Sequence, residues 1–196
     1  MQIDPAALSP RDAYRLLISC ILPRPIAFVS TLSREGVSNL APFSFFNGVT
    51  SDPPILSLSI STKRDGSKKD TWRNIEETGE FVVNVVVPEL MDAVQIGARE
   101  LPHNESELDL SGLATLPSVK VRPPRLADSP VQMECTLLKV VEVEETGLIL
   151  GRVVLFHARE EVVEGGRVDP RRLTFIGRLG GDSYCRVSDI FERKRD

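Results

Sequence analysis

The chain has 196 residues, 41% of them hydrophobic, which suffices for one domain with a sizeable core and excludes a largely disordered protein. The formal net charge is −4 and the two signs are interspersed, a distribution that argues against a nucleic-acid-binding protein, which would carry a basic patch. Neither a basic, apolar leader nor an apolar run long enough to span a bilayer is visible in the sequence. We therefore expect a cytoplasmic protein without nucleic-acid or membrane partners.

Cysteine spacing indicates packing rather than chemistry. Cys20, Cys135 and Cys185 are far apart and form no C-x-x-C pair, so we interpret all three as small packing residues. The basic run at 193–195 is interpreted as a solvated chain end.

A short helix is expected near the N-terminus. Ser9 is a favourable N-cap and Pro10 a favourable first helical residue, so the helix should run from Ala13 to about Ser19. We expect this helix to cover an open end of a sheet rather than to carry chemistry.

The stretch from 23 to 47 organises the chain. Period-2 alternation predicts a strand over 26–33, and a turn at 34–36 leads into a second strand over 37–41. Pro42 cannot donate a backbone hydrogen bond and is excluded from a central position in the sheet. Residues 43–48 are expected to form a loop, and their aromatic rings among small polar groups suit a flat polar ligand.

Residues 51–71 combine a serine-lined strand with a cationic loop. After a stiff turn at 51–54, apolar residues alternate with Ser57, Ser59 and Ser61, whose hydroxyl groups face either solvent or the phosphate and edge of a ligand. The loop at 62–71 is rich in lysine and hydroxyl groups and leads into a helix over 71–78, capped by Asp70 and stopped by Gly79. Such a helix start predicts a phosphate site.

The middle of the chain predicts a buried strand, a helix and an irregular segment. The strand at 81–87 contains Asn84, which either faces the ligand or bonds a neighbouring loop, and a helix should follow over 89–98. We expect residues 99–129 to lie over the surface of the β-barrel predicted below and to shape substrate access. Their acids, Glu105, Glu107 and Asp109, are interpreted as solvated rather than metal-binding, and His103 as a surface residue.

Two long strands, 131–145 and 148–159, should form a hairpin joined at Thr146 and Gly147. His157 on the second strand is either a proton donor or a packed histidine near a dimer interface. A polar loop is expected at 161–169.

These short strands, with few helices and no βαβ alternation, predict a mostly-β barrel with added helices, formed by one domain over residues 1–196. Gly177, Gly180 and Gly181 do not fit the dinucleotide-binding pattern, and no strand, turn and helix surround them. We assign no catalytic residue and no metal site.

Several segments in order resemble the flavin reductase-like family of FMN-binding split barrels. They are PRPIAFVST, SNLAPFSFFN, PPILSLSIS, KKDTWRNI, EFVVNVVV and FIGRLGGDSY. The resemblance covers nearly the whole chain. It implies non-covalent FMN at the interface of a homodimer, with NADH or NADPH as a possible electron donor. Some members of that family only bind or carry FMN.

The candidate flavin-binding residues follow from the residue patterns described above and from the family resemblance. Lysine and hydroxyl groups of the 59–71 region would hold the phosphate, and the 39–41 stretch would bond the ring edge. By the resemblance, Arg178 and Tyr184 would lie at the flavin. The full set is Arg24, Thr31, Asn39, Leu40, Ala41, Ser44, Ser59, Ser61, Lys63, Lys68, Asp70, Thr71, Arg178 and Tyr184.

Three functions remain open at the level of sequence. The first is a flavin reductase-type oxidoreductase, and the second is an FMN-binding electron carrier that would use the same residues. The third is a partner-binding β-barrel without flavin. The physiological acceptor, the choice between NADH and NADPH, and whether flavin is a bound cofactor or a substrate are likewise open.

Overall fold

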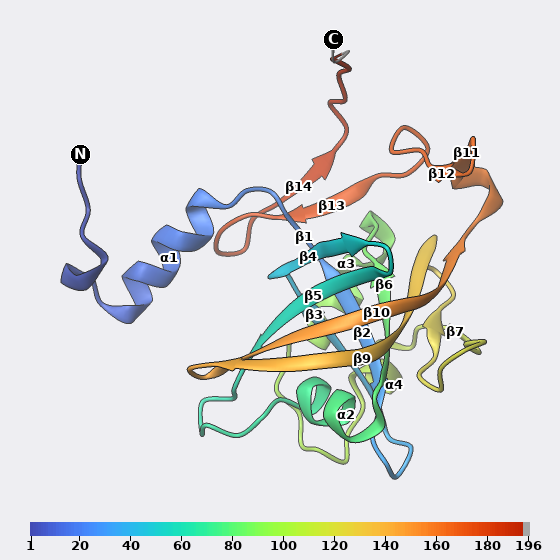
Figure 1. Ribbon diagram of the computed structural model, residues 1–196, viewed down its shortest axis with the longest axis horizontal. Helices are drawn as coiled ribbons and strands as arrows, with labels where there is room; N and C mark the ends of the chain where they lie inside the picture. The colour runs from blue at the N-terminus through green and yellow to red at the C-terminus, as the bar shows by residue number, and fades with distance from the viewer. Residues whose placement is uncertain (194–196) are drawn as a thin grey trace.

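The computed structural model describes residues 1–193 and consists mainly of antiparallel strands wrapped into a barrel (Figure 1). The strands of its main sheet are β2 (Ala27–Leu32), β3 (Ser38–Phe43), β4 (Phe46–Ser51), β5 (Pro54–Ser61), β6 (Glu80–Val85), β9 (Val131–Val143) and β10 (Thr146–Ala158). Their order in space is β3-β2-β6-β9-β10-β5-β4. The predicted mostly-β split barrel with added helices is confirmed.

One apolar cluster fills the barrel. Leu58, Phe81 and Ile149 belong to it and have no exposed surface. Helix α2 (Asp70–Thr78) lies at one end of the barrel, where Trp72 and Ile75 insert into the same cluster (Figure 1). The helix ends at Gly79 as predicted, in the left-handed conformation with φ of 73°.

A second apolar cluster lies on the other side of β2 and joins Phe28 and Leu40 of the sheet to Leu90 and Val94. The last two belong to the region expected as one helix over 89–98, which is a 3-10 turn η2 (Pro88–Leu90) followed by α3 (Met91–Gly97). A short helix, α4 (Glu107–Ser111), contributes Leu108. Strand β2 is thus buried on both faces, and residues 27–31 have no exposed surface.

Helix α1 (Pro10–Cys20) has the predicted N-cap, because the Ser9 hydroxyl oxygen accepts a hydrogen bond from the backbone N–H of Asp12 at 3.2 Å, but the helix begins at Pro10 and not at Ala13. The expectation that it covers an open end of the sheet is wrong. The helix stands off the barrel (Figure 1), and Ile18 is its one buried residue. Trp72 of α2 fills an end of the barrel instead.

Two turns differ from the sequence-based expectation. The loop expected over 43–48 becomes strand β4 at Phe46 and pairs with β5. The β9–β10 turn lies at Glu144 and Glu145, with φ of 50° at Glu144, whereas Thr146 and Gly147 pair within the ladder. Gly147 has a packing role instead, because a Cβ atom there would lie 2.6 Å from the ring of Trp72.

The remaining strands are short. A three-stranded sheet combines β1 (Arg24–Pro25), β13 (Phe175–Arg178) and β14 (Tyr184–Val187), and β7 (Thr115–Leu116) pairs with β8 (Arg125–Leu126). The polar loop expected at 161–169 contains the turn η3 (Glu160–Val162) and a hairpin of β11 (Val163–Glu164) and β12 (Arg167–Val168). A further 3-10 turn, η1 (Pro5–Ala7), precedes α1. Every helix within residues 1–193 is too short or too polar to cross a membrane.

Asn84 has the structural role that the sequence left open. Its side chain has no exposed surface, and Nδ2 donates to the carbonyl oxygen of Phe28 at 3.0 Å. Its Oδ1 accepts from the backbone N–H of Leu126 at 2.9 Å. The amide therefore ties β6 to β2 and to the short strand β8, so that its polar atoms are used within the fold.

The packing interpretation of the cysteines holds for Cys135, which is buried and whose thiol pKa is raised by that burial. It is wrong for Cys20, which is exposed on α1, and Cys185 is partly buried. The solvated chain end expected at 193–195 lies, beyond Arg193, outside the described residues.

Candidate functional site

Two adjoining cavities lie beside the C-terminal half of β3. The smaller has a volume of about 140 Å³ and the larger about 550 Å³, and both are lined by Pro42, Phe43 and Ala98. Strand β3 stands at one end of the sheet order, which is where Pro42 is tolerated, as the sequence predicted. Because the two cavities share these lining residues, we refer to them together as the groove over the end of this edge strand.

Asn39 connects three elements at the smaller cavity. With its amide oriented by its hydrogen-bond partners, Nδ2 donates to Oε2 of Glu107 at 3.2 Å, and Oδ1 accepts from the hydroxyl of Thr71 at 2.8 Å. The backbone N–H of Leu40 also faces Glu107 Oε2, at 3.4 Å. Burial raises the pKa of Glu107 above its usual range, and the nearby Asp70 carboxylate adds to the rise. The expectation that Glu107 is solvated is wrong, because α4 packs it against β3.

Asp70 is the first residue of α2 and does not cap it, since the N-cap is Lys69. Its carboxylate contacts Lys63 Nζ at 2.9 Å, His103 Nδ1 at 2.8 Å and the guanidinium of Arg73. Burial alone would raise the pKa of Asp70, but Lys63, His103 and Arg73 outweigh it and hold the pKa below its usual range. The predicted capping role is therefore replaced by an ion-pair anchor of the 62–69 loop.

Arg24 is 4% exposed at the wall of the larger cavity. Its Nη1 donates to the carbonyl oxygens of Ile18 and Ile21 at 2.6 and 3.1 Å, and Nη2 donates to that of Leu179 at 2.6 Å. Nε donates to the Ser44 hydroxyl at 3.3 Å. This guanidinium thus holds the end of α1 against the hairpin of β13 and β14.

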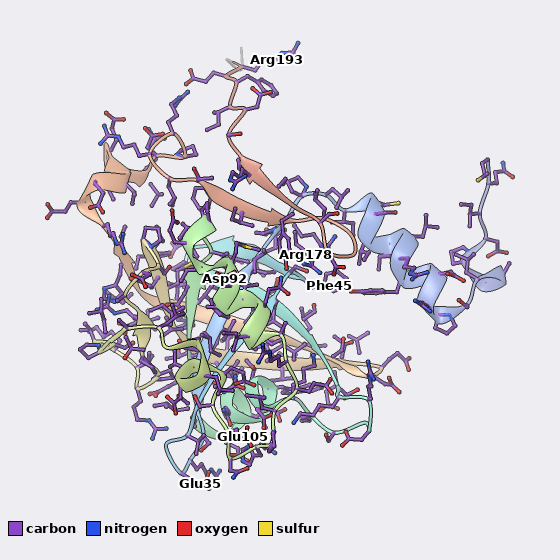
Figure 2. The ribbon with its side chains drawn as sticks, turned by 180° about the vertical axis from the view of Figure 1, so that it is seen from behind. Glu35, Phe45, Asp92, Glu105, Arg178 and Arg193 are labelled. Carbon is purple, nitrogen blue, oxygen red and sulfur yellow. The ribbon has the colours of Figure 1, made fainter. Side chains whose placement is uncertain are left out.

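Arg178 and Tyr184 form another wall of the larger cavity. The guanidinium carbon of Arg178 lies 4.3 Å from the centre of the Tyr184 ring, and an Nη group donates to the carbonyl oxygen of Gly181. The Tyr184 hydroxyl accepts from Gln95 Nε2 at 3.1 Å. Figure 2 shows Arg178 below the β13–β14 ribbon, on the side of the molecule nearer α1.

The two cavities bring together most of the predicted site residues. The smaller one is lined by Asn39, Ala41, Lys63, Asp70 and Thr71. The larger one is lined by Arg24, Ser44, Arg178 and Tyr184.

The other predicted residues do not line either cavity. Thr31 and Leu40 have no exposed surface, and Ser59 and Ser61 lie along β5. Lys68 Nζ contacts Glu76 at 2.8 Å and Glu142 at 3.2 Å, and it lies 4.5 Å from the centre of the Trp72 ring. A flavin contact by any residue of this group stays a prediction.

Sequence reasoning missed Lys69, Arg99 and Glu107, which also line the smaller cavity. Lys69 belongs to the cationic loop that the sequence predicted as a phosphate site, so its position in that loop could have identified it as a candidate. No local signal marked Arg99 and Glu107, because they reach the cavity only through the packing of 97–107 against β3.

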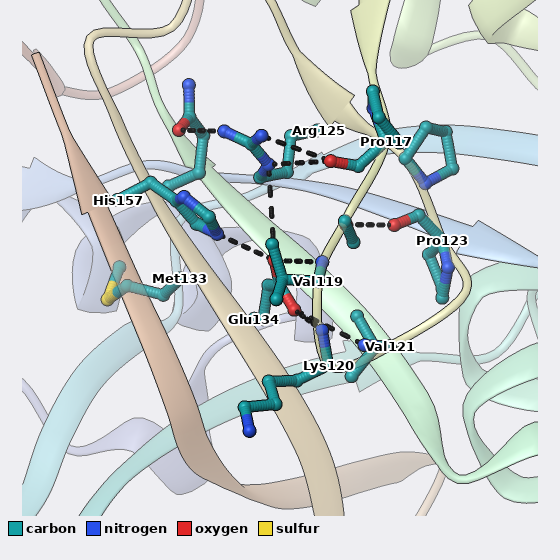
Figure 3. A network of polar contacts seen from close by, with 12 residues as sticks. Pro117, Val119, Lys120, Val121, Pro123, Arg125, Met133, Glu134 and His157 are labelled. Carbon is teal, nitrogen blue, oxygen red and sulfur yellow. Dashed lines mark hydrogen bonds and ion pairs between the residues drawn. The ribbon is translucent and has the colours of Figure 1, made fainter.

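His157 lies outside both cavities, in a polar network between β9 and β10 (Figure 3). Its Nε2 is 2.6 Å from Oε1 of Glu134, which has no exposed surface. The sequence placed no acid beside this histidine, because the pair joins different strands. The packed-histidine alternative fits this position better than the proton-donor alternative.

A family model for the flavin reductase like domain matches residues 18–177. The uncharacterized protein BH2278 of Halalkalibacterium halodurans is 40% identical over 201 residues, which span 100% of this chain and 96% of that protein. The structure of nitrilotriacetate monooxygenase component B from Bacillus cereus has a TM-score of 0.93 and 38% identity, with 98% of each chain covered. That of 2-nitrobenzoate 2-nitroreductase NbaA from Pseudomonas fluorescens has a TM-score of 0.92 and 31% identity, covering 100% of this chain and 96% of the other. The chain belongs to the flavin reductase-like domain family.

The donors around the smaller cavity fit the phosphate of a flavin mononucleotide. Lys63, Lys69 and Arg99 line it together with Thr71, the second residue of α2, where backbone N–H groups are free of helical partners. The larger cavity has the volume that small-molecule sites usually have, and its apolar lining includes Phe43. We call the smaller cavity, with its candidate phosphate donors, the phosphate end of the groove and the larger cavity its wider end.

Proposed function

We propose that the protein is an FMN-binding flavoprotein of the flavin reductase type, which accepts a hydride from NADH or NADPH. The observation that carries the proposal is the pair of adjoining cavities, with phosphate donors in the smaller one and room for stacked rings in the larger one. Family membership supports a flavin, and two neighbours named as a monooxygenase component and a nitroreductase support redox chemistry. When bound, FMN would supply the hydride and electron transfer itself.

The chain would contribute binding and orientation. Lys63, Lys69 and the first N–H groups of α2 would hold the phosphate. The part of FMN between its phosphate and its ring would lie over Pro42 and Phe43, which line both cavities. Its ring would lie in the larger cavity, within reach of Arg178. Glu107 and Thr71 already hold the Asn39 amide through hydrogen bonds. Asn39 would therefore act on the flavin site indirectly, through these two neighbours.

No nucleotide-binding fold for NADH or NADPH is present within residues 1–193, so the nicotinamide would stack on the open face of the flavin ring. If the electron acceptor uses the same face, donor and acceptor cannot be bound together. We then expect ping-pong kinetics with parallel double-reciprocal lines. Lines that intersect would contradict a shared face.

The absorption spectrum of the purified protein tests the flavin, and anaerobic mixing with NADH and NADPH tests the reductase. We expect the flavin absorbance to bleach with one donor or both. If neither donor bleaches it at millimolar concentration, the protein is an electron carrier reduced by another protein. A colourless protein that fails to bind added FMN would favour a partner-binding barrel instead.

A homodimer is part of the proposal. Leu138 of β9, Phe156 of β10 and Val49 of β4 are apolar and between 46% and 58% exposed, although their strands share one sheet. A second copy would cover such residues, and two-fold dimers are the commonest oligomers. Light scattering should give twice the mass of one chain. A monomer that still holds FMN tightly would contradict the dimer.

A further inference from the structure

One wall of the larger cavity belongs to the helix that stands off the barrel. Arg11, Tyr14 and Arg15 of α1 line it, together with Arg178 and Tyr184 of the hairpin. The helix contributes little to the core, since Ile18 is its one buried residue. Its position is nevertheless fixed, because buried Arg24 bonds the carbonyl oxygens near its end. Helix α1 therefore lines the cavity with cationic side chains but packs little against the hydrophobic core.

The charges of this wall are not matched by acids. Asp182 is the one carboxylate among the described residues that line the larger cavity, against Arg11, Arg15, Arg24 and Arg178. The smaller cavity is different, because its three cations face three acidic side chains. The cationic excess thus lies at the wider end of the groove, in a chain whose net charge is −4.

Two of these arginines are available to a ligand. Arg24 and Arg178 donate to backbone carbonyl oxygens. Within residues 1–193, Arg11 makes no hydrogen bond or ion pair, and Arg15 only approaches Asp12 at 3.9 Å. Guanidinium groups bind carboxylates and phosphates through paired N–H donors, and free ones in a cavity suit an anion.

The geometry points to Arg11 and Arg15 as the residues that recognise an anionic, aromatic redox partner of the flavin. This inference rests on the proposed function, in which the flavin ring occupies the same cavity. The negative group of the partner would meet the α1 arginines, and its ring would lie among Tyr14, Phe43 and the flavin. A nicotinamide dinucleotide, through its phosphates, and an aromatic carboxylate share this chemistry, and the experiment below separates them.

The test compares the double variant Arg11→Gln/Arg15→Gln with the control Arg34→Gln/Arg167→Gln. The control arginines are exposed and line neither cavity. Because each variant loses two arginines, both change the net charge equally. Calorimetry on the FMN-loaded protein would measure the dissociation constants of NADP⁺, NAD⁺ and benzoate. FMN and riboflavin titrations of the flavin-free protein would be done in parallel.

We expect the α1 double variant to bind at least one of these anions about tenfold or more weakly, as loss of a charge-assisted contact implies. FMN affinity should stay unchanged, and the control should bind as wild type does. Weakening for the dinucleotides alone assigns the wall to the donor, and weakening for benzoate alone assigns it to the acceptor. Unchanged binding of all three anions, or a loss of FMN affinity relative to riboflavin, overturns the inference. Failure of wild type to bind FMN at all would instead remove the proposed function.

Discussion

Partly buried His157 of β10 and fully buried Glu134 of β9 form a pair in which Nε2 and Oε1 are 2.6 Å apart (Figure 3). The same carboxylate accepts hydrogen bonds from the backbone N–H groups of Val119, at 2.8 Å, and of Lys120 and Val121. Glu134 thus fastens the irregular segment before β8 to the barrel wall. A carboxylate that satisfies three consecutive N–H groups belongs to the architecture rather than to the flavin chemistry.

We expect Glu134 to make stability depend on pH in the acid range. Burial alone would raise its pKa, but the N–H groups of Val119 and Lys120 and the His157 side chain outweigh burial and lower it below the ordinary value of 4.5. A carboxyl group whose pKa is lower in the folded state stabilises the protein above its unfolded pKa, and this stabilisation is lost as pH falls through the folded value. Glu134→Gln should therefore lower the free energy of unfolding at pH 7 by about 1–3 kcal/mol.

The measurement is urea unfolding at pH 7 and at several values below 4.5, with the exposed Glu145→Gln as control. The difference between Glu134→Gln and wild type should shrink as pH falls. A difference that stays constant down to pH 3 would contradict the assigned role of this carboxylate.

Glu107 should show the opposite pH dependence. Its pKa is raised by burial, so the charged form costs stability, and this cost grows as pH rises through the folded value. Glu107→Gln keeps an oxygen that can accept from Asn39 and Leu40 but removes the charge beside Asp70. We expect the variant to melt higher than wild type at pH 7 and equally at pH 4. Because a buried negative charge is removed from the phosphate end, its preference for FMN over riboflavin should increase.

Thermal melting at the two pH values and titration with both flavins check this expectation. Glu105→Gln, in the exposed part of the same segment, is the matched control. A lower melting temperature of Glu107→Gln at pH 7 would mean that the ionised carboxylate is a net stabiliser.

The fold could be predicted because its signals are local. Leu56, Leu58 and Ile60 alternate with serines, and the same residues are buried in β5 while the serines are partly or fully exposed. Ser9 and Gly79 mark helix ends for reasons contained within one turn of chain. Such patterns need no knowledge of what packs against them.

The site was less predictable because its charges are arranged by contacts between distant segments. Glu107 reads as a solvated acid in sequence, yet the packing of α4 on β3 buries it beside Asn39. Lys68 and Lys69 are equivalent in sequence. Lys68 pairs with Glu76 at 2.8 Å and with Glu142, 74 residues away, at 3.2 Å, whereas Lys69 lines the smaller cavity.

Gly151 is expected to be intolerant of any side chain. A Cβ atom at this position in β10 would lie 2.3 Å from the ring of Phe81, which has no exposed surface and cannot move aside. Gly151→Ala should therefore lose about 1–3 kcal/mol of stability through overpacking. Gly48→Ala is the matched control, because a Cβ atom in that exposed part of β4 meets nothing within 4 Å. Equal unfolding midpoints for the two variants would refute this account of the barrel core.

The phosphate end of the groove can be assigned by comparing two adjacent lysines. Lys69 lines the smaller cavity, whereas Lys68 would have to leave Glu76 and Glu142 to reach a phosphate there. We expect Lys69→Ala to lose about 1.5–3 kcal/mol of FMN affinity, roughly ten- to a hundredfold, and almost none for riboflavin, which lacks the phosphate. Lys68→Ala should change the ratio of the two affinities less. Titration of flavin fluorescence with both variants measures this ratio. A larger loss of FMN preference in Lys68→Ala would show that Lys68 abandons its carboxylate partners on binding, as the sequence-based assignment requires.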